Sequence, residues 1–182
     1  VYEEYKEHGF STPTRKFELY STLLEKWKCD PLPKFREPPE SPYSTPELFK
    51  EYPYILITGR RQPGFFHSEN RQLPWLRELH RDPIVEIHPE TAEKEGIEEG
   101  DWVVIESPRG KVRQRAKLFA GMDPRIVSAE HGWWFPEKKD PLHGWDESNI
   151  NILTDNAYET CDPAMGATSV RTLLCKIYPE KS

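Results

Sequence analysis

The second half of the chain alternates between apolar and polar positions, which predicts a series of short β-strands. Residues 84–88 and 111–118 alternate most clearly, and 102–107 and 126–129 have a similar strand-like composition. An apolar run over 54–58 ends abruptly at a glycine and two arginines. This run predicts a buried strand that leads directly into a polar loop.

Short helices and tight turns separate these strands. Residues 89–95 begin with proline and an acid and stop at Gly96, as a short helix does. A second helix is expected over 46–50, with Thr45 as its cap and Pro46 at its first position. Pro108-Arg109-Gly110 predicts a hairpin turn. A mainly β chain with short helices favours a small closed barrel over a doubly wound sheet.

The first part of the chain has a different character. The chain has 18 prolines against 10 glycines, and prolines crowd into residues 30–46, which predicts an extended arm or connector. Before it, a strand-like piece over 12–21 and one or two helical turns over 22–27 are too small to fold alone. We therefore expect an N-terminal segment with its proline-rich connector over 1–51, and a barrel domain over 52–182.

Composition excludes several classes of protein. The net charge of −6 argues against a general nucleic-acid binder, and no apolar run approaches the ~20 residues that cross a bilayer. The three cysteines have no zinc-ligand spacing, so we expect reduced core or surface thiols. The chain begins at Val1 rather than methionine, so we expect a fragment, from the cytoplasm or the periplasm of a prokaryote.

Candidate chemistry is concentrated where the first strand ends. Residues 58–61 (Thr-Gly-Arg-Arg) are followed closely by His67, Ser68 and Arg71. Arginine forks match phosphate oxygens two at a time, and glycine lets backbone N–H groups approach a ligand closely. The loop therefore indicates a local site for a polyanion. The alternative is a solvated hairpin whose charges keep its tip in water.

Several motifs follow one another in a characteristic order. These are a strand followed by Thr58-Gly59-Arg60; His88-Pro89-Glu90-Thr91-Ala92 with Gly96-Ile97 and Gly100-Asp101; Ser107-Pro108-Arg109-Gly110; and Asn149 to Asp155 continuing to Asp162-Pro163. From about Gly9 onward the chain resembles the C-terminal domain of the molybdopterin oxidoreductases, the dimethyl sulfoxide reductase family. The stretch 130–136 (Glu-His-Gly-Trp-Trp-Phe-Pro) resembles the branch that contains acetylene hydratase.

The resemblance implies a six-stranded double-psi β-barrel that caps a bis-molybdopterin guanine dinucleotide carrying molybdenum or tungsten. Asn151 stands where the family has a pterin-contacting amide in an Asn-x-Leu-Thr motif, and an amide can both donate and accept at a pterin edge. The residues expected to bind the cofactor are Thr58, Gly59, Arg60, Arg61, His67, Ser68, Arg71, His131, Gly132, Asn149, Asn151 and Arg171.

Some of these residues have simpler interpretations. Asn149 and Asn151 could hold a turn through local bonds between side chain and backbone. Either Arg60 or Arg61 could pair with an acidic residue. The aromatic stretch 133–135 is more typical of a packed ridge than of a substrate wall.

The chain departs from a complete family member in its catalytic equipment. The family ligates its metal through a residue of an earlier domain and often binds an iron–sulfur cluster through an N-terminal cysteine set, and neither is recognisable here. We therefore expect neither catalytic nor metal-ligating residues, and a chain that is not catalytic by itself. The expected partners are the other domains of the same oxidoreductase, with an iron–sulfur cluster elsewhere in it, and an iron–sulfur electron-transfer subunit.

Two alternatives remain open from the sequence. A double-psi barrel can also serve as a protein-interaction or substrate-recognition module without a cofactor. The chain could also be a separate small subunit of a related complex. The Thr58-Gly59-Arg60 motif together with Asn151 favours cofactor binding over the interaction module, and the missing methionine and truncated-looking leader weigh against the separate subunit.

Overall fold

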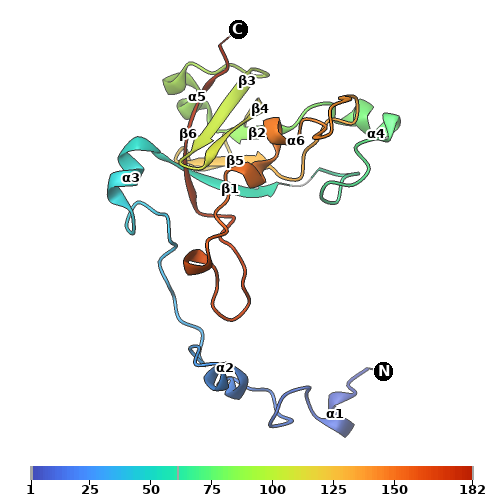
Figure 1. Ribbon diagram of the computed structural model, residues 1–182, viewed down its shortest axis with the longest axis vertical. Coiled ribbons are helices and arrows are strands. Elements are labelled where there is room, and N and C mark those ends of the chain that lie inside the picture. Colours follow the sequence, from blue (N-terminus) through green and yellow to red (C-terminus); the bar gives the residue numbers. More distant parts are fainter. Residues whose placement is uncertain (1, 61, 182) are drawn as a thin grey trace. The chain divides into compact units, whose positions relative to one another are not determined.

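The computed structural model describes residues 2–60 and 62–181, and for Gly59 and Arg60 it describes the backbone alone. The chain falls into two compact units (Figure 1). One unit comprises Val1–Arg36 with Cys161–Ala167, and the other comprises Glu37–Thr160 with Thr168–Ser182. The larger unit contains the sheet and therefore most of the residues that the sequence singles out.

The larger unit is built around a closed barrel in the strand order β1-β5-β2-β4-β3-β6. The pairs β1–β5 and β2–β4 are parallel, and the other pairs are antiparallel. This closed, six-stranded and mainly β architecture confirms the predicted fold class. The strands are β1 (Tyr54–Arg60), β2 (Ile84–Ile87), β3 (Trp102–Ser107), β4 (Gly110–Leu118), β5 (Ile126–Glu130) and β6 (Leu173–Pro179).

Alternating burial along the strands explains why the barrel forms. In β3 every second residue is buried, so Val103 and Ile105 point into the core while their neighbours are half-buried. Leu56 of β1 and Val127 of β5 are also fully buried in this core. Each such side chain stabilises the fold by roughly 1.5–3 kcal/mol relative to its exposed state. The period-two pattern in the sequence is therefore the direct cause of the sheet.

Short helices connect or flank the strands, and none of the described helices is long and apolar enough to cross a membrane. In the first unit, residues 12–21 form no strand, contrary to the strand-like pattern of their sequence, whereas 22–26 form the expected helical turn. The helices are α1 (Tyr5–His8), α2 (Thr22–Lys26), α3 (Pro46–Glu51), α4 (Pro74–Leu79), α5 (Pro89–Glu95) and α6 (Trp145–Ser148), with 3-10 turns η1 (Ile150–Ile152) and η2 (Tyr158–Thr160).

Two of these helices were predicted with their boundaries almost correct. Thr45 stands at the N-cap of α3, but its hydroxyl donates to the Ser41 carbonyl at 3.1 Å instead of capping the helix. His88 caps α5, because its Nδ1 accepts the Glu90 N–H at 3.2 Å. Gly96 ends α5 in the left-handed conformation. Proline at the first position and glycine after the last thus define α5 as the sequence indicates.

The compact unit that holds the barrel begins at Glu37, upstream of the boundary that the sequence predicts at residue 52. The end of the connector is tied to the barrel by Glu40. Its carboxylate pairs with the Arg109 guanidinium in the β3–β4 turn and accepts the Leu174 N–H at 3.0 Å. Proline-rich sequence gives no sign of such a long-range clamp.

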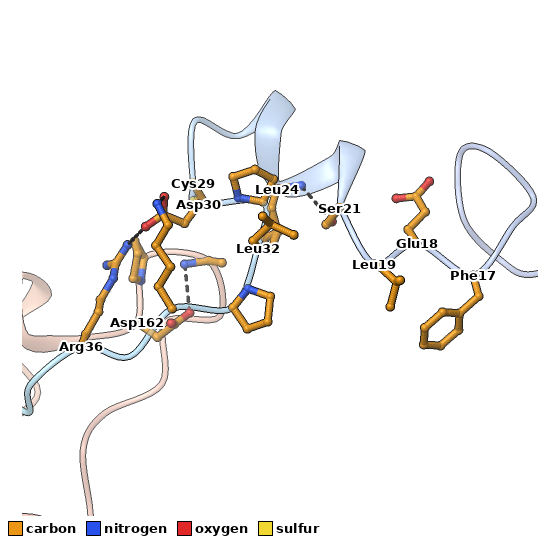
Figure 2. A pocket seen from close by; sticks show the side chains of 15 residues that line it. Phe17, Glu18, Leu19, Ser21, Leu24, Cys29, Asp30, Leu32, Arg36 and Asp162 are labelled. Atoms are coloured by element: carbon orange, nitrogen blue, oxygen red, sulfur yellow. Dashed lines mark hydrogen bonds and ion pairs between the residues drawn. The ribbon is translucent and has the colours of Figure 1, made fainter.

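The smaller unit has no buried residue among its described positions. Its most prominent feature is an open hollow of about 680 Å³ (Figure 2), lined by apolar side chains such as Phe17 and Leu32. The cations in this hollow, Lys34 and Arg36, both pair with Asp30 at 2.9 Å. The carboxylates of Glu18 and Asp162 also line the hollow, so its balance of charge does not favour an anion.

The three cysteines are reduced thiols, as the sequence predicts. Cys29 and Cys161 are half-buried, whereas Cys175 of β6 is fully buried in the barrel core. Burial raises the pKa of the Cys175 thiol well above its usual value. We therefore assign Cys175 to packing and not to chemistry.

A hydrogen bond between β3 and β6 gives the barrel one contribution to stability that depends on alkaline pH. Tyr178 donates its hydroxyl proton to the Glu106 carboxylate at 2.6 Å, which together with partial burial raises the pKa of Tyr178 from 10.0 to about 12. The folded chain holds this proton more tightly than the unfolded chain. The resulting stabilisation is complete below pH 10 and is lost as the pH rises through about 12.

We expect Tyr178→Phe to remove this contribution. Denaturation curves measured from pH 10 to 12 should therefore show a shallower loss of stability in the variant than in the unmodified chain. Tyr20 lies in the smaller unit and also donates its hydroxyl proton to a glutamate, Glu25. Tyr20→Phe therefore serves as a matched control outside the barrel. Equal slopes for the unmodified chain and Tyr178→Phe would contradict the assignment.

Candidate functional site

One end of the barrel collects the segments that the sequence singles out. Because β1 and β3 both run antiparallel to β6, and β5 runs parallel to β1, these three strands end on the same side. The starts of β2, β4 and β6 lie on that side as well. The connections at this end include α4 and α6, whereas α5 lies at the other end (Figure 1). Every described residue predicted to bind the cofactor belongs to these strand ends or their connections.

The strand β1 delivers the first of these residues. Its register with β5 shifts between Ile57 and Arg60, an irregularity of the kind that often lies next to functional sites. The Thr58 hydroxyl donates to the Val170 carbonyl at 2.7 Å, and the backbone N–H of Thr58 donates to the same oxygen at 3.2 Å. Thr58 therefore joins the end of β1 to the segment before β6. The Arg60 side chain and Arg61, both predicted to bind the cofactor, lie outside the described residues.

Arg71 is buried inside the loop that follows β1, with 1% of its surface exposed. Its guanidinium donates to the carbonyls of His67 at 3.0 Å, His131 at 3.3 Å and Gly132 at 3.1 Å. Burial lowers the pKa of the Arg71 guanidinium, and the nearby Glu130 carboxylate opposes this shift. The sequence predicts Arg71 as a cofactor ligand, but most of its donors are used within the protein.

Arg71 therefore fastens the 62–73 loop to the 131–136 loop. The two loops also meet at their backbones, since a Cβ atom on Gly132 would lie 2.8 Å from the carbonyl carbon of His67. Gly132 has a φ of +69°, which a side chain rarely adopts. The close contact places the His67 and His131 rings side by side, with His67 Nδ1 2.9 Å from His131 Nε2. One of these two nitrogens carries the shared proton.

The aromatic stretch after β5 is a packed ridge, which confirms the simpler of its two interpretations. Trp133 and Phe135 are buried, and Trp133 meets Phe65 edge to face with ring centroids 6.2 Å apart. The guanidinium of Arg71 lies 4.1 Å from the Trp133 ring and 4.6 Å from the Phe65 ring. Trp134 is half-buried and donates to the Ser68 carbonyl at 2.6 Å. These contacts hold the backbone of the loop on which Ser68 lies.

The two asparagines before β6 have different roles. The Asn149 side chain accepts the Asn151 N–H at 3.1 Å and so caps η1. This local bond is the simpler interpretation that the sequence allows. The Asn151 side chain is exposed, and none of the described residues hydrogen-bonds its carboxamide. Arg171 is also exposed and forms no ion pair with the part of the chain that the structure describes.

Sequence reasoning missed two polar residues that are buried at this end. Gln114 of β4 is fully buried; its amide donates to the carbonyls of Glu130 at 2.7 Å and Ser148 at 3.2 Å, and accepts the Glu130 N–H at 3.0 Å. Its position in the alternation of β4 predicts an inward side chain, so a polar residue there is a usable signal. Glu130 itself lies at the end of β5, where no local pattern indicates its partners.

The predicted residues therefore divide by whether their side chains are already used. Thr58, Arg71 and Asn149 bond to the protein, and His67 and His131 bond to each other. Three other predicted residues have exposed side chains without such bonds to the described part of the chain: Ser68 with its hydroxyl, Asn151 with its carboxamide and Arg171 with its guanidinium. This set of one hydroxyl, one amide and one cation suits an anionic ligand with hydrogen-bonding edges. The donor chemistry thus fits the cofactor implied by the sequence.

Comparison with known families supports this interpretation. The family model described as the molydopterin dinucleotide binding domain matches residues 54–173. The matched region runs from the start of β1 to the start of β6 and therefore includes the whole end of the barrel described above.

The relatives are large enzymes. Dopamine dehydroxylase of Eggerthella lenta is 46% identical over 181 residues, which cover 96% of this chain and 18% of that protein. Acetylene hydratase of Syntrophotalea acetylenica is 35% identical and covers 93% of this chain and 24% of its own length. The solved structure of acetylene hydratase from Pelobacter acetylenicus superimposes with a TM-score of 0.88 at 34% identity, covering 94% of this chain and 24% of that one. The chain thus spans about a quarter or less of these proteins.

Proposed function

Because the chain belongs to the molybdopterin dinucleotide-binding domain family, we propose that the barrel end formed by β1, β3 and β5 binds one face of a bis-molybdopterin guanine dinucleotide. In this proposal the chain is the C-terminal, cofactor-capping domain of a larger molybdenum or tungsten oxidoreductase. When bound, the cofactor supplies the metal centre and its redox chemistry. The chain's own residues bind and orient it.

The observation that carries the proposal is the set of exposed, unbonded polar side chains on segments that converge at one end of the barrel. Arg171 provides a cation for a phosphate, and Asn151 provides an amide that can both donate and accept. Ser68 adds a hydroxyl from the loop after β1, and at Gly59 the missing side chain lets a ligand approach the backbone N–H. A sheet end with these groups supports binding and orientation rather than turnover.

The finer parts of the proposal concern the rest of the enzyme. We place the metal ligand in an earlier domain and an iron–sulfur cluster elsewhere in the polypeptide, with an iron–sulfur electron-transfer subunit as a partner. The chain by itself performs no turnover in this scheme, since it offers one side of the site only. The division into a connector over 1–51 and a binding domain over 52–182 is part of the same proposal.

The test is to replace Asn151 and Arg171 with alanine, singly and together, in the polypeptide that carries this domain. Each lost bond to a charged or hydrogen-bonding ligand should lower cofactor retention by about 10-fold. Retention is measured as released pterin per mole of purified protein, by fluorescence after oxidation. Arg125→Ala is the matched control, because Arg125 is an exposed arginine next to the start of β5, at the opposite end of the barrel.

Unchanged pterin content in the double variant would contradict the proposal. In that case the barrel would instead be a protein-interaction or substrate-recognition module without a cofactor. Equal losses in Arg125→Ala and Arg171→Ala would also contradict it, because the effect would then not depend on the end of the barrel.

A further inference from the structure

Glu130 is a buried carboxylate that the proposed binding function does not use directly. It lies at the end of β5 with 1% of its surface exposed. Its side chain is 2.7 Å from His80 Nε2, accepts the Ile84 N–H at 3.2 Å, and pairs with the Arg71 guanidinium at 3.4 Å. Burying a charge is costly, and these three contacts offset that cost.

Glu130 is the counter-ion of Arg71. A guanidinium buried against Phe65 and Trp133 needs a nearby anion, and Glu130 is the carboxylate in ion-pair contact with it. With its charge balanced, Arg71 directs its N–H groups to carbonyls on both the 62–73 and 131–136 loops. Glu130 directly precedes the 131–136 loop, and through Arg71 it ties that loop to the 62–73 loop.

The loops held in this way carry residues of the proposed site. Ser68 and His67 lie on one loop, and His131 lies on the other. The first loop also follows β1 in the sequence, which ends at Arg60. Loss of the Glu130 charge would leave Arg71 without its counter-ion and would let the two loops separate.

We infer that Glu130 is a positioning residue for the cofactor-binding loops, and that it acts through Arg71 with His80 as its support. The role in cofactor binding rests on the proposed function, whereas the contacts of Glu130 with Arg71 and His80 lie within the chain itself. In this role an acidic side chain orders a surface that binds an anion. A carboxylate can do so here because it is buried behind the loops and balanced by Arg71.

The test uses the complete polypeptide that carries this domain, prepared without cofactor. Glu130→Gln keeps the shape of the side chain and removes its charge. We expect amide hydrogen exchange in residues 62–73 and 131–136 to accelerate by about 10-fold, while exchange in 102–118 stays unchanged. The imidazole nitrogen NMR signals of His67 should shift as its contact with His131 is lost.

Two further variants keep the result specific. Arg71→Lys retains the charge partner of Glu130 but lacks the planar fork, so the same two loops should exchange faster. Thr91→Val removes a buried hydrogen bond to the Pro124 carbonyl at the other end of the barrel and should leave both loops as they are. Loop exchange equal to that of the unmodified chain in Glu130→Gln and Arg71→Lys would overturn the inference. A uniform acceleration that includes 102–118 would also overturn it.

The inference and the proposed function fail separately. If Asn151→Ala and Arg171→Ala leave the pterin content unchanged, the binding proposal is wrong, whatever the loop exchange shows. If the binding proposal holds, Glu130→Gln in the complete polypeptide should lower pterin content by about 10-fold, although Glu130 makes no bond to the cofactor. Normal pterin content in that variant would show that cofactor binding does not depend on the ion pair between Glu130 and Arg71.

Discussion

Replacing Arg71 with methionine is expected to destabilise the barrel unit by about 3–5 kcal/mol, because it leaves the Glu130 carboxylate buried without its cation. Methionine retains an unbranched apolar stem that can lie between Phe65 and Trp133, so packing changes little. The loss therefore reports mainly the charge and the three carbonyl contacts. Denaturant titration of the 182-residue chain gives the free energy of unfolding.

Two comparisons make this result specific. Arg125→Met removes an arginine with 75% of its side chain exposed and should change stability by less than about 1 kcal/mol. Combining Arg71→Met with Glu130→Gln should recover part of the loss, since the uncompensated charge is then absent. If Arg71→Met and Arg125→Met cost the same, Arg71 is not the central contact between the loops.

Gly132→Ala is expected to have the second largest effect. The added methyl group would lie 2.8 Å from both the carbonyl carbon and the oxygen of His67, so the two loops would have to move apart. Since backbone atoms cannot yield as a flexible side chain can, we expect a cost of about 1–3 kcal/mol beyond that of the left-handed conformation. The contact between His67 and His131 should be lost with it.

Gly96→Ala provides a matched control for this variant. Gly96 has a φ of +68°, nearly that of Gly132, but an added Cβ would meet no atom within 4 Å. Its cost should be about 1–2 kcal/mol, from the left-handed conformation alone. The difference in unfolding free energy between the two variants isolates the contact between the loops. Equal losses would mean that the loops separate without strain.

Local patterns in the sequence predict the elements of this fold well. The strands near 84–88, 102–107, 111–118 and 126–129 follow from alternation, and α5 follows from its proline and glycine. These signals depend on neighbours within a few residues, so no knowledge of the tertiary structure is needed. The closed barrel was predicted from their number and spacing together with the family resemblance, and the pairing of strands confirms it.

The charged residues show where this reasoning stops. Arg71 finds its carboxylate 59 positions away, and Arg109 finds Glu40 at a separation of 69 positions. Nothing near either arginine in the sequence distinguishes a buried pair from an exposed ligand. The sequence places Arg71 on the loop after β1, while its burial and its partners depend on how β1 and β5 pair. The positions of Asn151 and Arg171 as cofactor contacts stay predictions.

The order of the strands has a consequence for the synthesis of this domain. β6 lies between β1 and β3, although it is the last strand in the sequence. Until the ribosome has produced Leu173–Pro179, β1 and β3 each lack one neighbour and expose unpaired backbone groups. Non-local pairings of this kind form slowly and leave unpaired, aggregation-prone strand edges in the nascent chain. The barrel can therefore close only after β6 has been synthesised, and until then two strand edges are open to mispairing.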